Sequence, residues 1–136
     1  MAGFSNYLEA MIENVLLRTQ AAYKPAAIYI ALFTAVPSDA GGGTEATGGN
    51  YARQQVTQAD AQWNAPTGTP RSTSNVNDIA WNAVTWSGTV VAWAIMDAVS
   101  AGNMLGWFDC TDKVVNVADS VKFTGGAPGA LVVQVD

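Results

Sequence analysis

The chain has 136 residues, a net charge of −5 and 49% hydrophobic residues, but only 12% charged residues. A chain of this length can fold as one domain with a complete core. Its charged fraction lies well below the ~25% of an average soluble domain, so much of the surface must be uncharged, as in proteins that sit permanently against neighbours. No run of basic residues exists, which argues against nucleic acid and anionic membranes as partners.

The longest apolar stretch, residues 26–35, is far shorter than the ~20 residues that span a bilayer. Glu9 and Glu13 precede it, where a secretory signal carries basic residues. We therefore expect synthesis in a cytoplasm and a mature chain that begins near residue 1. Cys110 is the only cysteine, so no internal disulfide can form, and we interpret it as a small buried hydrophobic residue rather than a reactive thiol.

The amino-terminal region is predicted to form an amphipathic helix over residues 6–18. Its apolar side chains recur with the spacing of one helix face: Tyr7, Leu8, Met11, Ile12, Val15 and Leu16. Asn6 followed by Glu9 is a candidate capping pair, and Ser5 is the alternative cap. We expect Leu8, Met11, Ile12 and Val15 to pack against the rest of the domain; the alternative is that a neighbouring subunit covers them.

The remainder of the chain predicts a mainly β fold. Residues 28–34 are apolar on both faces, which is typical of a central strand, and further strands are expected at 51–56, 79–84, 89–96, 103–108, 120–123 and 130–135. The Gly- and Pro-rich residues 37–50 and 64–74 are predicted to be loops, the first of them mobile unless a partner holds it. The pattern favours an antiparallel β-sandwich or jelly-roll-like single domain, with the helix in residues 1–20 and the sandwich in residues 26–136.

The sequence offers little for catalysis. It contains no histidine, which removes the commonest general base and the commonest transition-metal ligand. The carboxylates of Asp97, Asp109, Asp112 and Asp119 are expected at strand ends, where Asp caps turns. A glycosidase pair of carboxylates and a calcium site at Asp109 and Asp112 are the less favoured alternatives. We therefore expect no enzymatic activity and no cofactor.

Tryptophans are the most prominent remaining signal. Trp81 and Trp93 occur in apolar alternating segments and are expected in the core. Trp63, beside a Pro-rich segment, is expected to be the most exposed, where it would suit protein docking or a sugar-binding platform.

Several short motifs follow one another along the chain: Phe-Ser-Asn-Tyr-Leu-Glu at 4–9, Pro-Ala-x-Ile-Tyr-x-Ala-Leu-Phe-Thr at 25–34, Glu-x-x-Gly-Gly-x-Tyr-Ala-Arg-Gln at 45–54, Gly-Asn-x-Leu at 102–105 and Val-Asn-x-x-Asp at 115–119. In this order they resemble a family of small tailed-phage virion proteins, labelled tail fibre proteins in genomes and also similar to capsid cement proteins. Trp81, where the family more often has Phe, and Ala118, where Gly is common, depart from its pattern.

The resemblance implies a virion structural protein without catalytic residues. Because the chain lacks the repeats and coiled-coil heptads of elongated fibres, we interpret it as a capsid cement (decoration) subunit. Such a subunit would lie on the outer capsid surface, bind the major capsid protein and self-associate as a dimer or trimer. The alternative is a tail fibre or tail-associated protein that binds a host receptor.

The expected interface residues are Tyr7, Asp39, Glu45, Tyr51, Arg53 and Trp63. We predict that Arg53 pairs with a carboxylate such as Glu45 at the base of the Gly-rich loop, because a guanidinium binds a carboxylate through two parallel hydrogen bonds. The loop, residues 36–50, is predicted to be the principal adhesive element.

Overall fold

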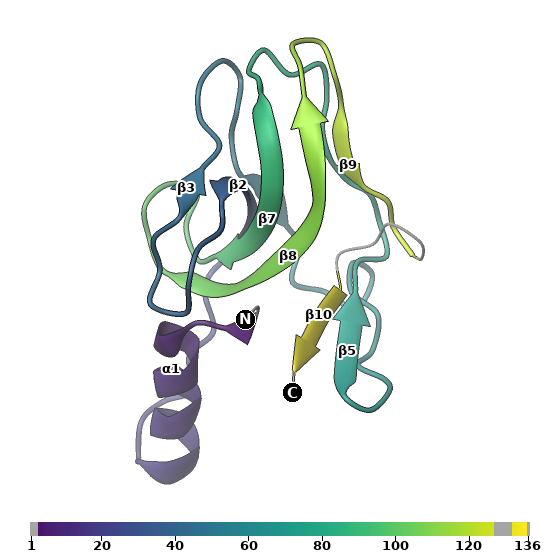
Figure 1. Ribbon diagram of the computed structural model, residues 1–136. Helices are drawn as coiled ribbons and strands as arrows, with labels where there is room; N and C mark the ends of the chain where they lie inside the picture. Colours follow the sequence, from purple (N-terminus) through teal and green to yellow (C-terminus); the bar gives the residue numbers. More distant parts are fainter. Residues whose placement is uncertain (1–2, 127–131, 136) are drawn as a thin grey trace.

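An antiparallel sheet forms the centre of the fold in the computed structural model, which describes residues 3–126 and the backbone of residues 132–135 (Figure 1). The strand order is β1-β8-β7-β2-β3, and β4 also pairs with β2. The strands are β1 (Gly3–Phe4), β2 (Ile28–Ala35), β3 (Thr44–Glu45), β4 (Gln54–Val56), β7 (Gly88–Met96) and β8 (Met104–Val115).

Two smaller antiparallel pairs complete the β structure: β5 (Arg71–Ser74) with β10 (Val132–Val135), and β6 (Ile79–Trp81) with β9 (Val121–Phe123). One helix, α1 (Asn6–Leu17), precedes the sheet. The predicted mainly β, antiparallel fold with an N-terminal helix is confirmed, and its layers are consistent with a β-sandwich.

Strand β2 is the central strand that its apolar sequence predicts. Ile30, Ala31 and Leu32 are completely buried. Ile30 and Leu32 belong to the larger core cluster with Trp81 and Trp93, whereas Ala31 belongs to a second cluster with Phe33 and Trp107. Since successive side chains of a strand point to opposite faces, both faces of the sheet carry buried apolar side chains. The expected core positions of Trp81 and Trp93 are confirmed.

Strand β8 is longer than residues 103–108, the predicted range. It curves across the lower end of the sheet and rises beside β7 (Figure 1). Residues 109–114 carry no apolar alternation, but their backbone pairs with β7, as Ala92 with Asp109 and Val90 with Lys113. Asp109 and Asp112 therefore lie inside a strand, and the prediction that they cap strand ends is wrong.

The two predicted loops both contain strands. Within residues 37–50, β3 pairs with the edge of β2, and the buried Ala46 donates its N–H to the Leu32 carbonyl at 2.8 Å. Within residues 64–74, β5 pairs with β10; its sequence is polar, so hydrophobic alternation could not reveal it. The predicted strand at 79–84 ends at Trp81, before Ala83 adopts a positive φ of 44°. Part of the predicted strand at 130–135 lies outside the described residues.

The helix begins at Asn6 with Ser5 as its N-cap. The Ser5 hydroxyl accepts the Leu8 N–H at 3.3 Å and donates to the carbonyl of Met104. The Ser5 N–H donates to the Leu105 carbonyl, so β8 fixes the cap residue. The predicted Asn6–Glu9 capping pair is wrong, and the alternative cap, Ser5, is confirmed.

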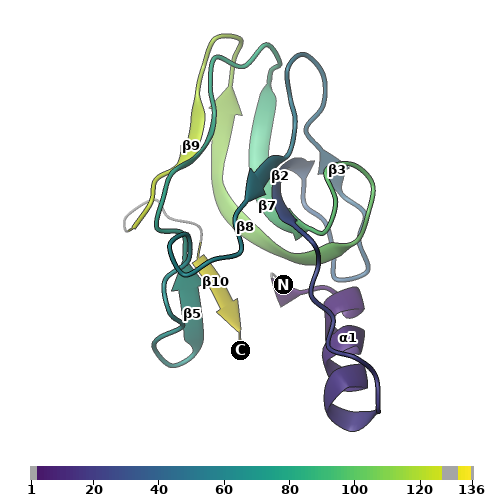
Figure 2. The ribbon, with the colours of Figure 1, turned by 180° about the vertical axis from the view of Figure 1, so that it is seen from behind.

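The helix extends beyond one end of the sheet and covers neither of its faces (Figures 1 and 2). No residue of α1 is buried: Leu8 and Met11 are half-buried, whereas Ile12 is 39% exposed and Val15 37%. Leu16 and Leu17 are 75% and 81% exposed. The prediction that the domain covers the apolar stripe is therefore wrong for Ile12 and Val15. Within the described residues, no helix has the length and hydrophobicity needed to cross a membrane.

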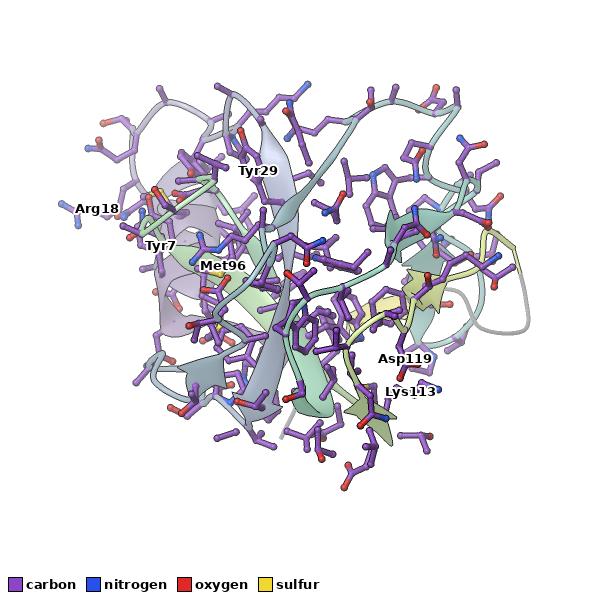
Figure 3. All side chains as sticks on the ribbon, turned by 90° about the horizontal axis from the view of Figure 1, so that it is seen from above. Tyr7, Arg18, Tyr29, Met96, Lys113 and Asp119 are labelled. Atoms are coloured by element: carbon purple, nitrogen blue, oxygen red, sulfur yellow. The ribbon has the colours of Figure 1, made fainter. Side chains whose placement is uncertain are left out.

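At the opposite end, three connections are tied together (Figure 1). Asn50 accepts the Thr85 N–H at 2.8 Å and donates to the Ala83 carbonyl at 3.2 Å. The Val84 N–H donates to the Asp119 carbonyl at 2.9 Å, which joins the connection between β6 and β7 to the connection between β8 and β9. Figure 3, seen from above, shows Lys113 and Asp119 on the side away from α1, where Tyr7 and Arg18 lie. One end of the molecule thus carries the exposed apolar helix, and the other carries these hydrogen-bonded connections, with Val117 exposed among them.

Candidate functional site

Arg53, which directly precedes β4, binds two other segments of the chain at once. Its Nη2 lies 2.7 Å from Glu45 Oε2 and its Nε 2.8 Å from Glu45 Oε1, which is a bidentate pair. Its Nη1 donates to the carbonyls of Ala98 (2.7 Å) and Ala101 (2.8 Å) in the connection between β7 and β8. The predicted Arg53–Glu45 pair is confirmed. The side chain of Arg53 is only 7% exposed and that of Glu45 26%, so this pair holds the sheet edge together from inside.

Tyr51 completes this cluster. Its hydroxyl donates to Glu45 Oε1 at 3.0 Å and accepts the Leu32 N–H at 3.0 Å. Burial, together with the nearby Glu45 carboxylate, raises the pKa of Tyr51. The hydrogen bond to Glu45 also raises the pKa of Arg53, so the guanidinium stays charged while Tyr51 stays neutral. Tyr51, Glu45 and Arg53 therefore fix β3 and β4 on the edge of β2.

Asp39 lies in a different place, between the sheet and α1. Its Oδ1 accepts the indole N–H of Trp107 at 3.0 Å, and its backbone carbonyl accepts the Asn6 N–H at 2.9 Å. Asp39 thus joins the Gly-rich segment to the start of the helix. It lines a pocket of about 290 Å³ together with Gly41, Gly42 and Asn103, among others.

Asp97 is a further organising residue, which the sequence analysis placed only at a strand end. Its carboxylate accepts the Tyr23 hydroxyl at 2.8 Å and both the N–H (2.6 Å) and Nδ2 (2.9 Å) of Asn103. Burial acts in the opposite direction, but the hydrogen bonds from Asn103 and Tyr23 hold the pKa of Asp97 below its ordinary value. Tyr23 packs edge-to-face on Tyr7 at 5.9 Å, so this network also anchors the predicted interface residue Tyr7. The spacing of Asp97 and Asn103 around Gly102 is the sequence signal that could have indicated this turn.

Trp63 lies apart from the other predicted interface residues. It is partly buried against the core and lines a groove together with Ile28, Gln58, Asp60 and Pro66, among others. The six predicted interface residues thus belong to four groups: the Glu45–Tyr51–Arg53 cluster, the helix junction with Asp39, the Tyr7–Tyr23 contact and the Trp63 groove. Their roles in binding a partner stay predictions.

The geometry offers little to hold a metal. In the part of the chain that the structure describes, no three His, Cys, Asp or Glu side chains gather in a way that could bind an ion. Cys110 is a half-buried free thiol that packs against the core. Burial raises its pKa, and Asp112 and Asp109 add to this effect, which disfavours the reactive thiolate.

Comparison with known families decides the class of protein. A family model described as "Podophage GP4 fiber I protein gp80" matches residues 3–131. The chain belongs to this family. It is therefore a phage structural protein of the virion, as the resemblance of its motifs implied. A search of curated proteins found no match.

Proposed function

We propose that this family member is a non-catalytic subunit of the phage fibre or of its attachment to the tail. The observation that carries the proposal is the match of residues 3–131 to a fibre protein family. The proposed role is mechanical: the subunit holds a fixed place in the particle by docking against other virion proteins.

The distribution of interactions supports a mechanical role. Arg53 and Glu45 tie three segments together, and Asp97 and Asp39 each join elements that are distant in sequence. Carboxylates used in this way are occupied by internal partners and are not directed at a substrate. Such cross-links suit a subunit that transmits force between neighbours, because they stiffen the sheet edges where contacts would be made.

The apolar end of the molecule supports an attachment surface. Ile12, Val15 and Leu16 are exposed on α1, and together with Leu8, Met11, Ala22 and Tyr23 they line a pocket of about 220 Å³. Large exposed apolar patches mark interaction sites, because leaving each such side chain in water forfeits roughly 1.5 kcal/mol or more. We propose that another virion subunit covers this stripe, while the opposite end of the molecule points outward.

A second candidate is a capsid cement subunit that binds the major capsid protein on the outer surface of the head. The observation that favours it is the small sandwich itself, since the described residues contain neither repeats nor a long coiled-coil helix. A cement protein would stabilise the shell by binding the assembled lattice. Self-association as a dimer or trimer is compatible with both candidates.

Antibody labelling of intact virions separates the two. Gold-labelled antibody against the purified chain, viewed by electron microscopy, is expected to gather on the fibres or on the tail where they attach. Labelling spread over the head, with none on the tail or fibres, would overturn the fibre proposal and favour the cement protein.

A further inference from the structure

A groove of about 730 Å³ lies beside β5, away from the Arg53 cluster and from α1. Its volume falls within the range of roughly 300–1,000 Å³ that is usual for small-molecule sites. It is lined by Ile28, Gln58, Ala59, Asp60, Trp63, Asn64, Ala65, Pro66 and Thr73. The lining combines flat apolar groups with amide, hydroxyl and carboxylate groups and contains no cation.

Trp63 differs from the other tryptophans in how it is held. Trp81 donates its indole N–H to the Ala52 carbonyl at 2.7 Å, and Trp107 donates to Asp39. The Trp63 N–H is buried and has no acceptor among the described residues; of the other indoles, Trp86 alone shares this property. Trp86 is buried in the core, whereas Trp63 is only partly buried and borders the groove. Trp63 therefore gives the groove an aromatic surface.

The polar groups around Trp63 are of two kinds. Asn64 is fixed in place, since its Nδ2 donates to Ser74 Oγ at 3.0 Å and its carbonyl accepts the Thr73 hydroxyl. Gln58 and Asp60, in contrast, make no side-chain hydrogen bond or ion pair within residues 3–126. An amide and a carboxylate are thus available to a ligand that lies on the indole.

The surroundings disfavour a peptide strand or a nucleic acid as the ligand. A peptide that adds to a sheet needs an unpaired edge, but β5 is paired with β10 on one side. On its other side, the Asn64 N–H donates to the Ser74 carbonyl, and Thr67 and Ser72 exchange backbone hydrogen bonds of 2.9 Å. A nucleic acid needs cations for its phosphates, whereas Asp60 is the charged residue of this lining.

We infer that this groove is a carbohydrate-binding site for a short oligosaccharide that is neutral or carries an amino group. The apolar C–H face of a sugar ring packs on an indole, while its hydroxyl groups are both donors and acceptors. Gln58 can donate to and accept from these hydroxyls, and Asp60 accepts from them or from an amino group. The inference goes beyond the structural role proposed above and does not depend on which part of the virion holds the protein.

The test uses the purified full chain on an array of bacterial surface polysaccharides and their oligosaccharide fragments, followed by calorimetry on the ligands that bind. Trp63→Ala and the double variant Gln58→Ala/Asp60→Ala are each expected to weaken binding about tenfold or more, equivalent to about one good hydrogen bond to a charged group or one stacked ring. The double variant is expected to fold normally, because neither side chain has a hydrogen-bond or ion-pair partner within residues 3–126.

The matched control is Gln55→Ala/Asp112→Ala, which removes an exposed amide and an exposed carboxylate outside the groove. It is expected to bind as the unaltered chain does. Absence of binding to every glycan on the array would overturn the inference. Binding that is unchanged in both groove variants would also overturn it, because the sugar would then occupy another surface.

Discussion

The bidentate pair of Arg53 and Glu45 is the most consequential contact at the level of single residues. Arg53→Ala removes two hydrogen bonds to the Glu45 carboxylate and leaves the carbonyls of Ala98 and Ala101 without this donor, so we expect the free energy of unfolding to fall by about 2 kcal/mol or more. Chemical denaturation measures this change. The control is Lys122→Ala, which breaks an exposed pair with Asp78 and should cost less than about 1 kcal/mol. Equal effects of the two substitutions would contradict an internal clamp.

Asp97 predicts a pH dependence. Its pKa is lowered in the folded protein, so it stabilises the fold above the ordinary Asp pKa of about 3.9, and this stabilisation is lost as the pH falls through the lower, folded value. Asp97→Asn should therefore reduce stability at neutral pH, and the difference from the unaltered protein should shrink below about pH 4. Denaturation at several pH values measures both effects. A difference that stays constant down to pH 2, or a similar profile for the exposed control Asp112→Asn, would contradict this role of Asp97.

Much of the residue-level site could be predicted from sequence, and the failures have physical causes. Arg53 and Glu45 were recognisable because a guanidinium beside a carboxylate in one short segment pairs readily. The partners of Asp97 and Asp39 could not be predicted, since Tyr23 and Trp107 lie 74 and 68 residues away and only the folded sheet brings them together. The buried position of Arg53 was also not foreseen, because burial of a charge depends on this tertiary arrangement.

At the level of elements, the pattern of apolar residues predicted the strands and the helix that have such a pattern. It missed the strands that only backbone hydrogen bonds stabilise. The central strand β2 and the helix α1 have strong periodic patterns, and both formed where expected. Strand β5 and the second half of β8 are polar, so only their hydrogen-bonded partners make them strands. The spacing of apolar residues in α1 likewise predicted an apolar stripe, but it could not predict whether the domain or another subunit covers that stripe.

The Gly-rich segment was predicted to be mobile in the free protein, but its contacts indicate otherwise. Ala46 is buried and its N–H donates a hydrogen bond to the Leu32 carbonyl. A Cβ added at Gly49 would clash with Thr85, so this part of the segment is closely packed. We expect the Ala46 N–H to exchange slowly with solvent in the free protein. Hydrogen exchange measures this rate. Exchange of residues 44–50 as fast as in an unstructured peptide would instead support a segment that becomes ordered only on the particle.

If the exposed stripe on α1 is an attachment surface, a substitution there should impair incorporation into virions without destabilising the fold. Leu16→Lys changes a side chain that is 75% exposed, so the free energy of unfolding should change by less than about 0.5 kcal/mol, while incorporation into virions should fall strongly. Incorporation is measured by complementing a phage that lacks the gene. The control is Val114→Lys, which also replaces an exposed apolar side chain by lysine, at a position on β8 that is 61% exposed. Normal incorporation of Leu16→Lys would contradict the proposed attachment surface.

At the scale of the whole molecule, the two ends have different chemistry. One end presents an apolar helix that the domain does not cover, and the other presents three connections that hydrogen bonds of Asn50, Val84 and Asp119 hold together. A subunit with this asymmetry can be fixed at one end and exposed at the other. This arrangement suits a fibre attached to a tail, and it is the reason that we place the helix end toward the particle.

The number of copies in each virion tests this account most directly. Quantitative mass spectrometry of purified particles, with the portal protein as an internal standard, gives this number. Rings of tail proteins follow the low cyclic symmetry of the tail, so for a subunit of the fibre or of its attachment we expect about a dozen copies or a small multiple of that number. Hundreds of copies, in a fixed ratio to the major capsid protein, would contradict it and identify a subunit of the shell.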